Sequence, residues 1–499
     1  MSPGREGWGR GRRCPLEEPI GRIGPIRPIT ATAVGDSPDR GMPTWTVDSP
    51  LAGCAADSGT LASYFGPRGR GPITGKAAVS MGATIAQKIL ARASGRDQVA
   101  TGEIVWAAVD LALMSDTSGP RRIAAGLERL GGKPWDPEKV CVIADHFVPA
   151  SDETEAAIQV VTRDWSHAKG IRKFHFFEGI MHIVSIERGY IWPGMLMVGA
   201  DSHSVTAGGM GCMAVPVGST EILGVVATGE IWLRVPETIE VRWTGRLSRG
   251  VMAKDMMLAT LKRMRCDGAT YKSIEYTGSG VHALPIDERL VLSNMTIELG
   301  GKAGIVAADD MVCEYLAARG VAAPTPVLSD HDAVYCDLVL DDASTLVPQV
   351  ALPHSPDNGV NVDQAAGQAL DIAYIGACTG AKYHDLALAA EVLRGRRVHP
   401  DTPLLIAPAS KEVYERAERD GITEIFIAAG ATFTASSCGA CLGVGPNALK
   451  ANVRCISSTN RNFRGRMGSH QSEVYLASPA TVAASAIKGK IADPRVYLQ

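Results

Sequence analysis

Two cysteines separated by two residues are candidates for chemistry. Cys438 and Cys441 lie in the segment SSCGACLG (436–443). A C-x-x-C pair is typical of half a zinc site, a redox pair, or two ligands of an iron–sulfur cluster. The chain has no second C-x-x-C to complete a structural zinc site, and the pair lies far along the chain for a thioredoxin-like motif. On this segment alone the three interpretations stay open.

A third cysteine favours the cluster. Cys378, in IGACTG (375–380), ends an apolar run and is followed by small residues. Three thiolates leave one iron of a cubane without a protein ligand, and that iron can act as a Lewis acid toward a substrate. An electron-transfer cluster is normally held by four cysteines. The sequence therefore predicts one [4Fe–4S] cluster per subunit, with one iron not ligated by protein.

Four segments resemble the signature blocks of the aconitase superfamily. They are GADSHSVTAGGMG (199–211), IGACTG (375–380), SSCGACLGVG (436–445) and STNRNFRGRMG (458–468). Their order and spacing are similar to those of the family, and the resemblance covers 81–499 but none of 1–80. It implies a hydro-lyase that isomerises a 2-hydroxy dicarboxylate through its dehydrated alkene. The isopropylmalate dehydratase branch is the most similar, with homoaconitases and methylmalate-type dehydratases as alternatives.

The resemblance also implies roles for individual side chains. The matching motifs assign catalytic acid/base or hydrogen-bonding roles to Asp145, His146, His182, Asp201, His203 and Glu298. They assign the binding of substrate carboxylates to Arg461 and Arg466. Around the cluster ligands Cys378, Cys438 and Cys441 they place Ser202, Asn294 and Asn460.

These residue types suit the removal of water from a hydroxy acid. The reaction needs a Lewis acid, an acid that protonates the departing hydroxyl, and a base for a weakly acidic C–H. An aspartate beside a histidine fixes its tautomer and raises its basicity. The planar, permanently charged guanidinium of arginine suits bidentate recognition of carboxylates.

One segment departs from the family pattern. MSDTSGPRR (114–122) stands where family members carry a glutamine, or a histidine with an acidic neighbour, that contacts substrate. Ser115, Asp116 and Thr117 are polar enough for that role, and we expect Ser115 to bind substrate.

Charge and composition exclude several other classes. The net charge of -3 gives no reason to expect nucleic acid or an anionic membrane as partner, and it argues against a cluster-free, RNA-binding relative. No apolar run reaches the ~18 residues that a spanning helix needs. Eleven scattered cysteines in a chain of this length do not indicate a disulfide scaffold, so we expect a soluble, cytoplasmic protein.

Strands that alternate with helices must position these side chains. We expect strands within 139–145, 194–201, 370–380 and 402–410, and helices within 81–95 and 385–395. This alternation predicts an α/β fold with parallel sheets, in which ligands bind beyond the carboxyl ends of strands. The expected architecture is three α/β/α domains around a cluster-containing cleft. We place them at 81–236, 237–345 and 363–499, with a linker at 346–362.

The sequence also leads to predictions about the two ends of the chain. Residues 1–80 are rich in Gly, Pro and Arg and show no apolar periodicity, which predicts a disordered or non-native extension. Single-chain members of the family have a fourth, swivelling domain after the last shared block, and it supplies the C–H base. The resemblance implies that this chain lacks that domain and pairs with a separate small subunit that carries it.

Overall fold

The computed structural model describes residues 82–322 and 324–498. The expected extension at 1–80 lies outside the described residues. The first described helix, α1 (Ile85–Ala93), confirms the helix predicted within 81–95 and begins after Thr84, whose hydroxyl caps it. Within the described ranges, no helix is both long and apolar enough to cross a membrane.

Five parallel strands form the first sheet, in the order β4-β3-β2-β5-β6. They are β2 (Leu111–Ser115), β3 (Val140–Ala144), β4 (Lys173–Phe176), β5 (Leu196–Gly199) and β6 (Met213–Pro216). β3 and β5 confirm the strands predicted within 139–145 and 194–201. Successive side chains of a strand point to opposite faces, so Cys141 enters one hydrophobic cluster and Val142 another. The sheet is therefore buried on both faces, as parallel sheets usually are.

Helices cover both faces of this sheet. α2 (Pro120–Arg129), α3 (Glu153–Ala168) and α5 (Ser219–Thr228) share the apolar cluster of one face. α4 (Met181–Glu187) and the 3-10 helix η2 (Ser202–Met210) share the cluster of the other face. A separate antiparallel ribbon pairs β1 (Ile104–Ala108) with β7 (Glu230–Arg234).

The second sheet has four parallel strands, in the order β10-β9-β8-β11. They are β8 (Thr238–Thr244), β9 (Ser273–Thr277), β10 (Ala303–Val306) and β11 (Asp337–Asp342). Its helices are α6 (Ala253–Met264), α7 (Ser279–His282), α8 (Ile286–Met295) and α9 (Asp310–Ala317), and the 3-10 helix η3 (Thr296–Leu299) follows α8. α6 and α8 pack against each other and against the apolar face of the sheet.

The third sheet has seven strands, in the order β13-β12-β18-β17-β14-β15-β16. They are β12 (Gln349–Ala351), β13 (Gly359–Asn361), β14 (Ile372–Ile375), β15 (Leu404–Ile406), β16 (Thr432–Phe433), β17 (Arg454–Ser457) and β18 (Glu473–Ala477). Its helices are α10 (Val362–Ala365), α11 (Tyr383–Leu393), α12 (Lys411–Arg419), α13 (Ile422–Ala429), α14 (Gly439–Leu442) and α15 (Pro479–Lys488). β14, β15 and α11 confirm the elements predicted within 370–380, 402–410 and 385–395.

The segment 346–362, predicted to be a linker, is part of this sheet. It contains β12 and β13, and β12 pairs antiparallel with both β13 and β18. Val350 and Ala351 are completely buried there. Low charge is typical of such a buried strand as well as of a linker, and Pro353 is tolerated because it lies between the two strands.

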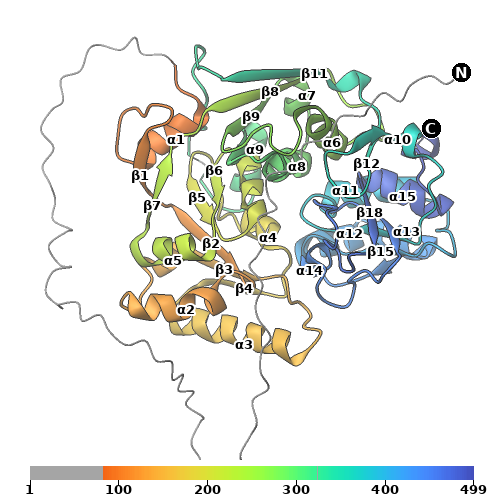
Figure 1. The fold of residues 1–499 in the computed structure, drawn as a ribbon, viewed down its shortest axis with the longest axis horizontal. Helices are drawn as coiled ribbons and strands as arrows, with labels where there is room; N and C mark the ends of the chain where they lie inside the picture. The colour runs from red at the N-terminus through yellow and green to blue at the C-terminus, as the bar shows by residue number, and fades with distance from the viewer. Residues whose placement is uncertain (1–81, 323, 499) are drawn as a thin grey trace, which may run out of the picture. The chain divides into compact units, whose positions relative to one another are not determined.

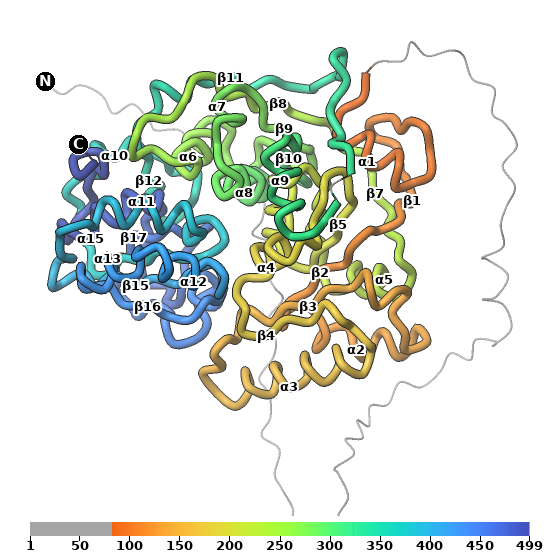
Figure 2. Tube along the Cα trace, turned by 180° about the vertical axis from the view of Figure 1, so that it is seen from behind, coloured from red at the N-terminus to blue at the C-terminus, as the bar shows by residue number. Residues whose placement is uncertain are grey.

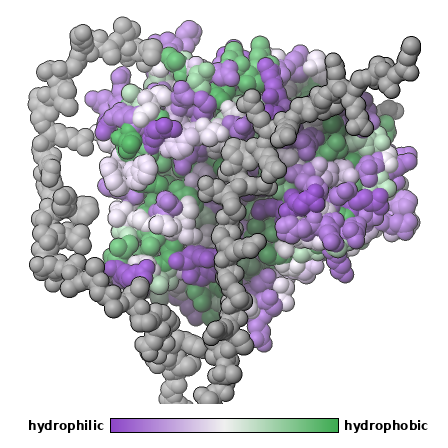
Figure 3. Space-filling view, in the orientation of Figure 1, coloured by the Kyte–Doolittle hydropathy of each residue, from purple (hydrophilic) through white to green (hydrophobic). Residues whose placement is uncertain are grey.

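Shared hydrophobic clusters join the three sheets and their helices. A single hydrophobic cluster contains Leu113 of β2, Leu290 of α8 and Ile375 of β14. Figure 1 and Figure 2 show α4 and α8 between the first sheet and the C-terminal elements. Figure 3 shows hydrophilic side chains gathered over the face that belongs to these C-terminal elements. Each predicted domain contains a sheet of its own, while the boundaries at 81–236, 237–345 and 363–499 stay a prediction.

Replacing Gly208 by alanine should destabilise the fold. A Cβ added at Gly208 in η2 would lie 1.8 Å from the carbonyl oxygen of Gly304 in β10, so backbone would have to move. Overpacking of this kind costs about 1–3 kcal/mol, and urea unfolding of Gly208→Ala should show a loss of that size.

Gly224→Ala is the matched control for this substitution. Nothing lies within 4 Å of a Cβ added at Gly224, which is inside α5. Alanine there should raise the free energy of unfolding by up to about 1 kcal/mol. Equal losses for the two variants would contradict the close contact between η2 and β10.

Candidate functional site

The site residues predicted from the sequence follow strand ends of the first and third sheets or lie on α8 and η3 of the second. Asp145 follows β3, Asp201 follows β5, Cys378 follows β14, and Asn460 follows β17. The carboxyl ends of parallel strands are where α/β proteins bind ligands. The hydrophobic clusters that join the three sheets bring these ends together.

The three cysteines lie close to one another in the core. Cys378 and Cys441 are each 1% exposed and Cys438 is 6% exposed. Cys438 precedes the single turn of α14 and Cys441 is within it, a spacing of three residues that puts both thiols on one side of the turn. The side chain of Asn460 joins the third cysteine to this pair, since its Nδ2 donates to Cys378 Sγ at 3.4 Å and its Oδ1 accepts from Cys441 Sγ at 3.6 Å.

Further donors surround the sulfurs. Asn294 Nδ2 donates to Cys378 Sγ at 3.0 Å and also lies within hydrogen-bonding distance of Thr206 Oγ1, at 2.6 Å. Arg466 Nη2 lies 3.9 Å from Cys441 Sγ. Burial raises the pKa of Cys378 to about 12, so a thiolate at this position needs a positive partner such as a metal.

The three sulfurs do not all lie within 4.8 Å of one another. In the described part of the chain, the groups whose ligand atoms all lie within 4.8 Å of one another are His182, Asp201 and His203, and Asp116, Asp145 and His146. The three cysteines do not form such a group. Tetrahedral zinc, with Zn–S bonds of about 2.3 Å, would bring its sulfurs within about 4 Å of one another. The donor set therefore fits a larger, several-metal group with sulfur ligands.

Asp145 and His146 form a buried hydrogen-bonded pair. Asp145 Oδ1 lies 2.6 Å from His146 Nδ1, and Asp145 Oδ2 accepts from the Met181 backbone N–H at 2.8 Å. Burial opposes a charge on His146, but the carboxylates of Asp145 and Asp116 outweigh it and raise the pKa of His146 well above its usual range. The imidazole therefore holds a proton that its Nε2 can present.

Asp116 belongs to this pair as well. Its carboxylate accepts from the backbone N–H groups of His146 at 3.1 Å and Phe147 at 3.0 Å, and it lies 3.6 Å from His146 Nδ1. The neighbouring Ser115, predicted to bind substrate, shares hydrogen bonds within its own turn with Thr117 at 2.8 Å and Ser118 at 3.2 Å. From the sequence, Asp116 was considered only for contact with substrate, and its place beside His146 was not predicted. Its place directly after the buried strand β2, which pairs with β3, was the signal.

A second aspartate–histidine pair lies beside the first. His182 Nε2 lies 2.9 Å from Asp201 Oδ1, which also accepts the His203 backbone N–H at 2.8 Å. The other oxygen of Asp201 lies 3.8 Å from His146 Nε2. Burial opposes the charge of Asp201, but His182 and the other two imidazoles hold its pKa well below its usual range. His182 Nδ1 is buried and has no hydrogen-bond partner.

Glu298 is held between an imidazole and a guanidinium. Its Oε1 lies 3.0 Å from His203 Nε2, and Arg461 Nε donates to both carboxylate oxygens at 2.9 Å. Arg461 Nη1 also lies 3.5 Å from Ser202 Oγ. Burial alone would raise the pKa of Glu298, but Arg461 and His203 lower it to about 2. Burial and Arg461 lower the pKa of His203, so Glu298 is ionised and His203 neutral near pH 7.

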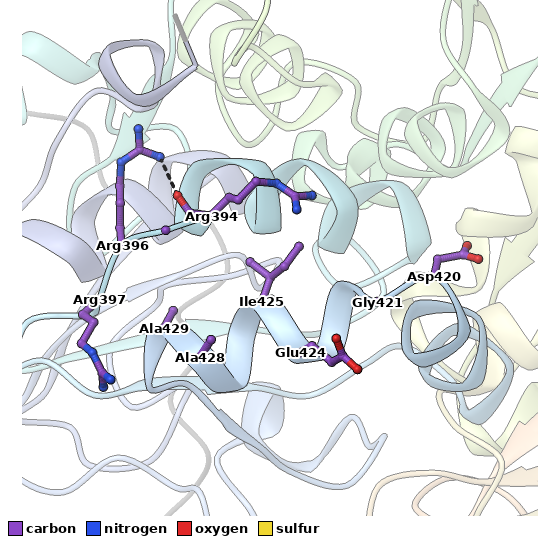
Figure 4. A pocket seen from close by; sticks show the side chains of 10 residues that line it. Arg394, Arg396, Arg397, Asp420, Gly421, Glu424, Ile425, Ala428 and Ala429 are labelled. Carbon is purple, nitrogen blue, oxygen red and sulfur yellow. Dashed lines mark hydrogen bonds between the residues drawn. The ribbon is translucent and has the colours of Figure 1, made fainter.

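A small hollow opens beside these groups. It has a volume of about 150 Å³ and lies between His146 and the loop that carries the C-x-x-C pair, with Ser437 and Gly439 in its wall. A larger hollow of about 580 Å³, between α11 and α13, contains Arg394, Arg396 and Arg397. Figure 4 shows these arginines pointing in different directions, so they do not converge on one anion. The small hollow is the candidate site.

The chain is similar in sequence to known proteins of one family. The sequence profile described as "Aconitase family (aconitate hydratase)" matches residues 87–369 and 363–489. The 3-isopropylmalate dehydratase large subunit 1 of Methanopyrus kandleri is 47% identical over 420 residues, which cover 84% of this chain and 100% of that protein. The 3-isopropylmalate dehydratase large subunit of Hydrogenobaculum sp. is 43% identical, with 83% of this chain and 98% of that protein covered. That of Aquifex aeolicus is 42% identical, with coverages of 83% and 97%.

The low pKa of Glu298 makes part of the stability dependent on pH. Its folded-state value of about 2 lies below the usual 4.5, so the unfolded chain binds the extra proton as the pH falls through this window. The stabilisation is complete above pH 4.5, is lost progressively down to pH 2, and amounts to roughly 3 kcal/mol. Glu298→Gln should therefore flatten the dependence of the unfolding midpoint on pH in this window.

The exposed Glu424 provides the control for this measurement. Glu424→Gln should leave the slope of the wild-type chain unchanged. A Glu298→Gln variant with the wild-type slope would mean that this carboxylate does not carry the stabilising ion pair.

Proposed function

The chain belongs to the aconitase family, and we propose that it is the large, cluster-carrying subunit of a hydro-lyase that isomerises 3-isopropylmalate in leucine biosynthesis. Three buried cysteines beside two aspartate–histidine pairs carry the proposal. Relatives named 3-isopropylmalate dehydratase large subunit, 40–47% identical over more than four-fifths of the chain, support this substrate over other malate derivatives.

Membership of the family implies an iron–sulfur cluster. We propose a [4Fe–4S] cluster held by Cys378, Cys438 and Cys441, with one iron not ligated by protein. The burial of the three thiols and the amide donors from Asn294 and Asn460 support this assignment. When bound, such a group supplies a Lewis acid for the poor hydroxide leaving group.

The two aspartate–histidine pairs have the protonation states that dehydration needs. His146, charged and oriented by Asp145, is the acid that protonates the departing hydroxyl through its Nε2. His182 Nε2 donates to Asp201, which stays ionised and lies beside His146 of the first pair. Because all four side chains are hydrogen-bonded before substrate arrives, little reorganisation is needed in the reaction.

The remaining residues act on water and on substrate carboxylates. Glu298 is ionised and hydrogen-bonded to His203, and it helps to orient the water in the rehydration step. Arg466 and the Nη groups of Arg461 offer guanidinium donors for a substrate carboxylate. We also propose that the hydroxyls of Ser202 and Ser115 contact substrate.

The relatives are named large subunits, which implies that a separate small subunit completes the enzyme. We propose that this partner, in a heterodimer, carries the swivelling domain with the C–H base. A cytoplasmic location is also part of the proposal, because cluster thiolates need a reducing compartment.

Metal analysis of the anaerobically purified chain tests the cluster. We expect about four irons and as much sulfide per chain, with little zinc. Cys438→Ser should lose most of the iron while far-ultraviolet circular dichroism stays unchanged. Cys336→Ser, at an exposed cysteine, is the matched control and should keep the wild-type iron content. One zinc per chain with no sulfide would refute the enzyme in favour of a zinc-stabilised binding module.

Activity measurements test the need for a partner. The chain alone should dehydrate 3-isopropylmalate at under about a hundredth of the rate of the pair, because loss of a catalytic base commonly costs 10²–10⁴-fold. Adding the small subunit should restore the activity. A panel of malate derivatives then identifies the substrate, and full activity of the chain alone would overturn the two-subunit arrangement.

A further inference from the structure

A lysine that is not part of the proposed catalytic groups lies buried behind the cysteines. Lys254, near the start of α6, is 1% exposed. Its ammonium donates to the carbonyl oxygens of Thr459 at 2.6 Å and Ser458 at 3.3 Å, and to the hydroxyl of Thr379 at 3.3 Å. These acceptors lie on the turn that follows Cys378 and on the turn that ends at Asn460. Lys254 thus ties together the two turns that deliver a cluster ligand and its amide donor.

The charge of Lys254 lacks a close carboxylate partner in the described part of the chain. Among the described residues no carboxylate oxygen lies within 4.0 Å of its Nζ, whereas the equally buried Lys382 pairs with Asp385 at 2.6 Å. Two acids near the start of α6 do not supply a full negative charge, since burial raises the pKa of Asp255 to about 7 and that of Glu288 to about 8. An isolated buried ammonium costs several kcal/mol, so its counter-charge must come from another source.

We propose that Lys254 is the buried counter-charge of the iron–sulfur cluster and a positioning residue for its ligand turns; the inference rests on the proposed function. Three thiolates outweigh the positive charge of an oxidised cluster core, so the assembly is an anion. Reduction adds one more negative charge. A fixed cation in a low-dielectric interior stabilises the reduced form more than the oxidised one, and therefore raises the reduction potential of the cluster.

A redox titration tests this role without relying on enzyme activity. Wild-type chain and Lys254→Met are loaded anaerobically with ferrous iron and sulfide, and the signal of the reduced cluster is followed by electron paramagnetic resonance. The equilibrium constant for reduction should fall about tenfold in Lys254→Met, which is a shift of about 59 mV for one electron. Lys254→Arg keeps the charge and should stay within about twofold of wild type.

Lys262→Met is the matched control, because Lys262 is an exposed lysine on the same helix. Solvent screens its charge, so the equilibrium constant should not change. A Lys254→Met variant that loads normally and titrates like wild type would overturn the proposal. Failure of the wild-type chain itself to take up iron and sulfide would instead overturn the proposed function.

Stability of the cluster-free chain distinguishes a counter-charge from a purely structural lysine. Without the cluster the ammonium lacks its counter-charge, so cluster-free Lys254→Met should melt at or above the temperature of cluster-free wild type. A cluster-free Lys254→Met chain that melts clearly below wild type, and that titrates like wild type once loaded, shows that Lys254 acts only through its hydrogen bonds and contradicts the proposal.

Discussion

Ionised side chains that are removed from water need partners of opposite charge, and this requirement governs the whole site. The Asp201 carboxylate lies between the imidazoles of His182 and His146, and the Glu298 carboxylate lies between His203 and Arg461. In each case the partners come from different elements of the chain. The protonation states that suit dehydration therefore exist only when the tertiary structure is complete. A buried carboxylate without its partners would take up a proton or would disrupt the core.

The parallel sheets explain why so many polar groups can meet without breaking the core. β3 and β5 deliver Asp145 and Asp201, while β14 and β17 deliver Cys378 and Asn460. Each polar side chain follows the end of a strand in the chain. The strand itself therefore stays apolar and pairs with a neighbouring strand on both edges. One hydrophobic cluster runs through the first sheet, α8 and the third sheet, and its packing determines how far apart the strand ends lie. The geometry of the chemistry is thus a consequence of apolar packing several residues away.

Much of this arrangement is predictable from the sequence because the relevant signals are local. Buried strands such as β3 and β5 appear as continuous apolar runs, and the C-x-x-C pair has a fixed spacing on one turn. The strands within 346–362 were not predicted, because a short edge strand and a linker have the same low charge. The pairing of Asp116 with His146 was not predicted either, for a different reason. The contact between them joins two strands that are neighbours in the sheet but distant in the chain.

Nonlocal contacts also determine what Lys254 can do. In the sequence it is one lysine near the start of an amphipathic helix, where a solvated side chain is the ordinary expectation. Its burial follows from the packing of α6 against α8 and from the turns of the third sheet that accept its protons. Since no carboxylate of the described residues lies within 4.0 Å of its ammonium, the same packing that positions the cysteines leaves a positive charge near them. A thiolate-bound cluster is an anion, and it therefore stabilises the positive charge of Lys254. Binding of the cluster and stabilisation of this part of the core are thus coupled.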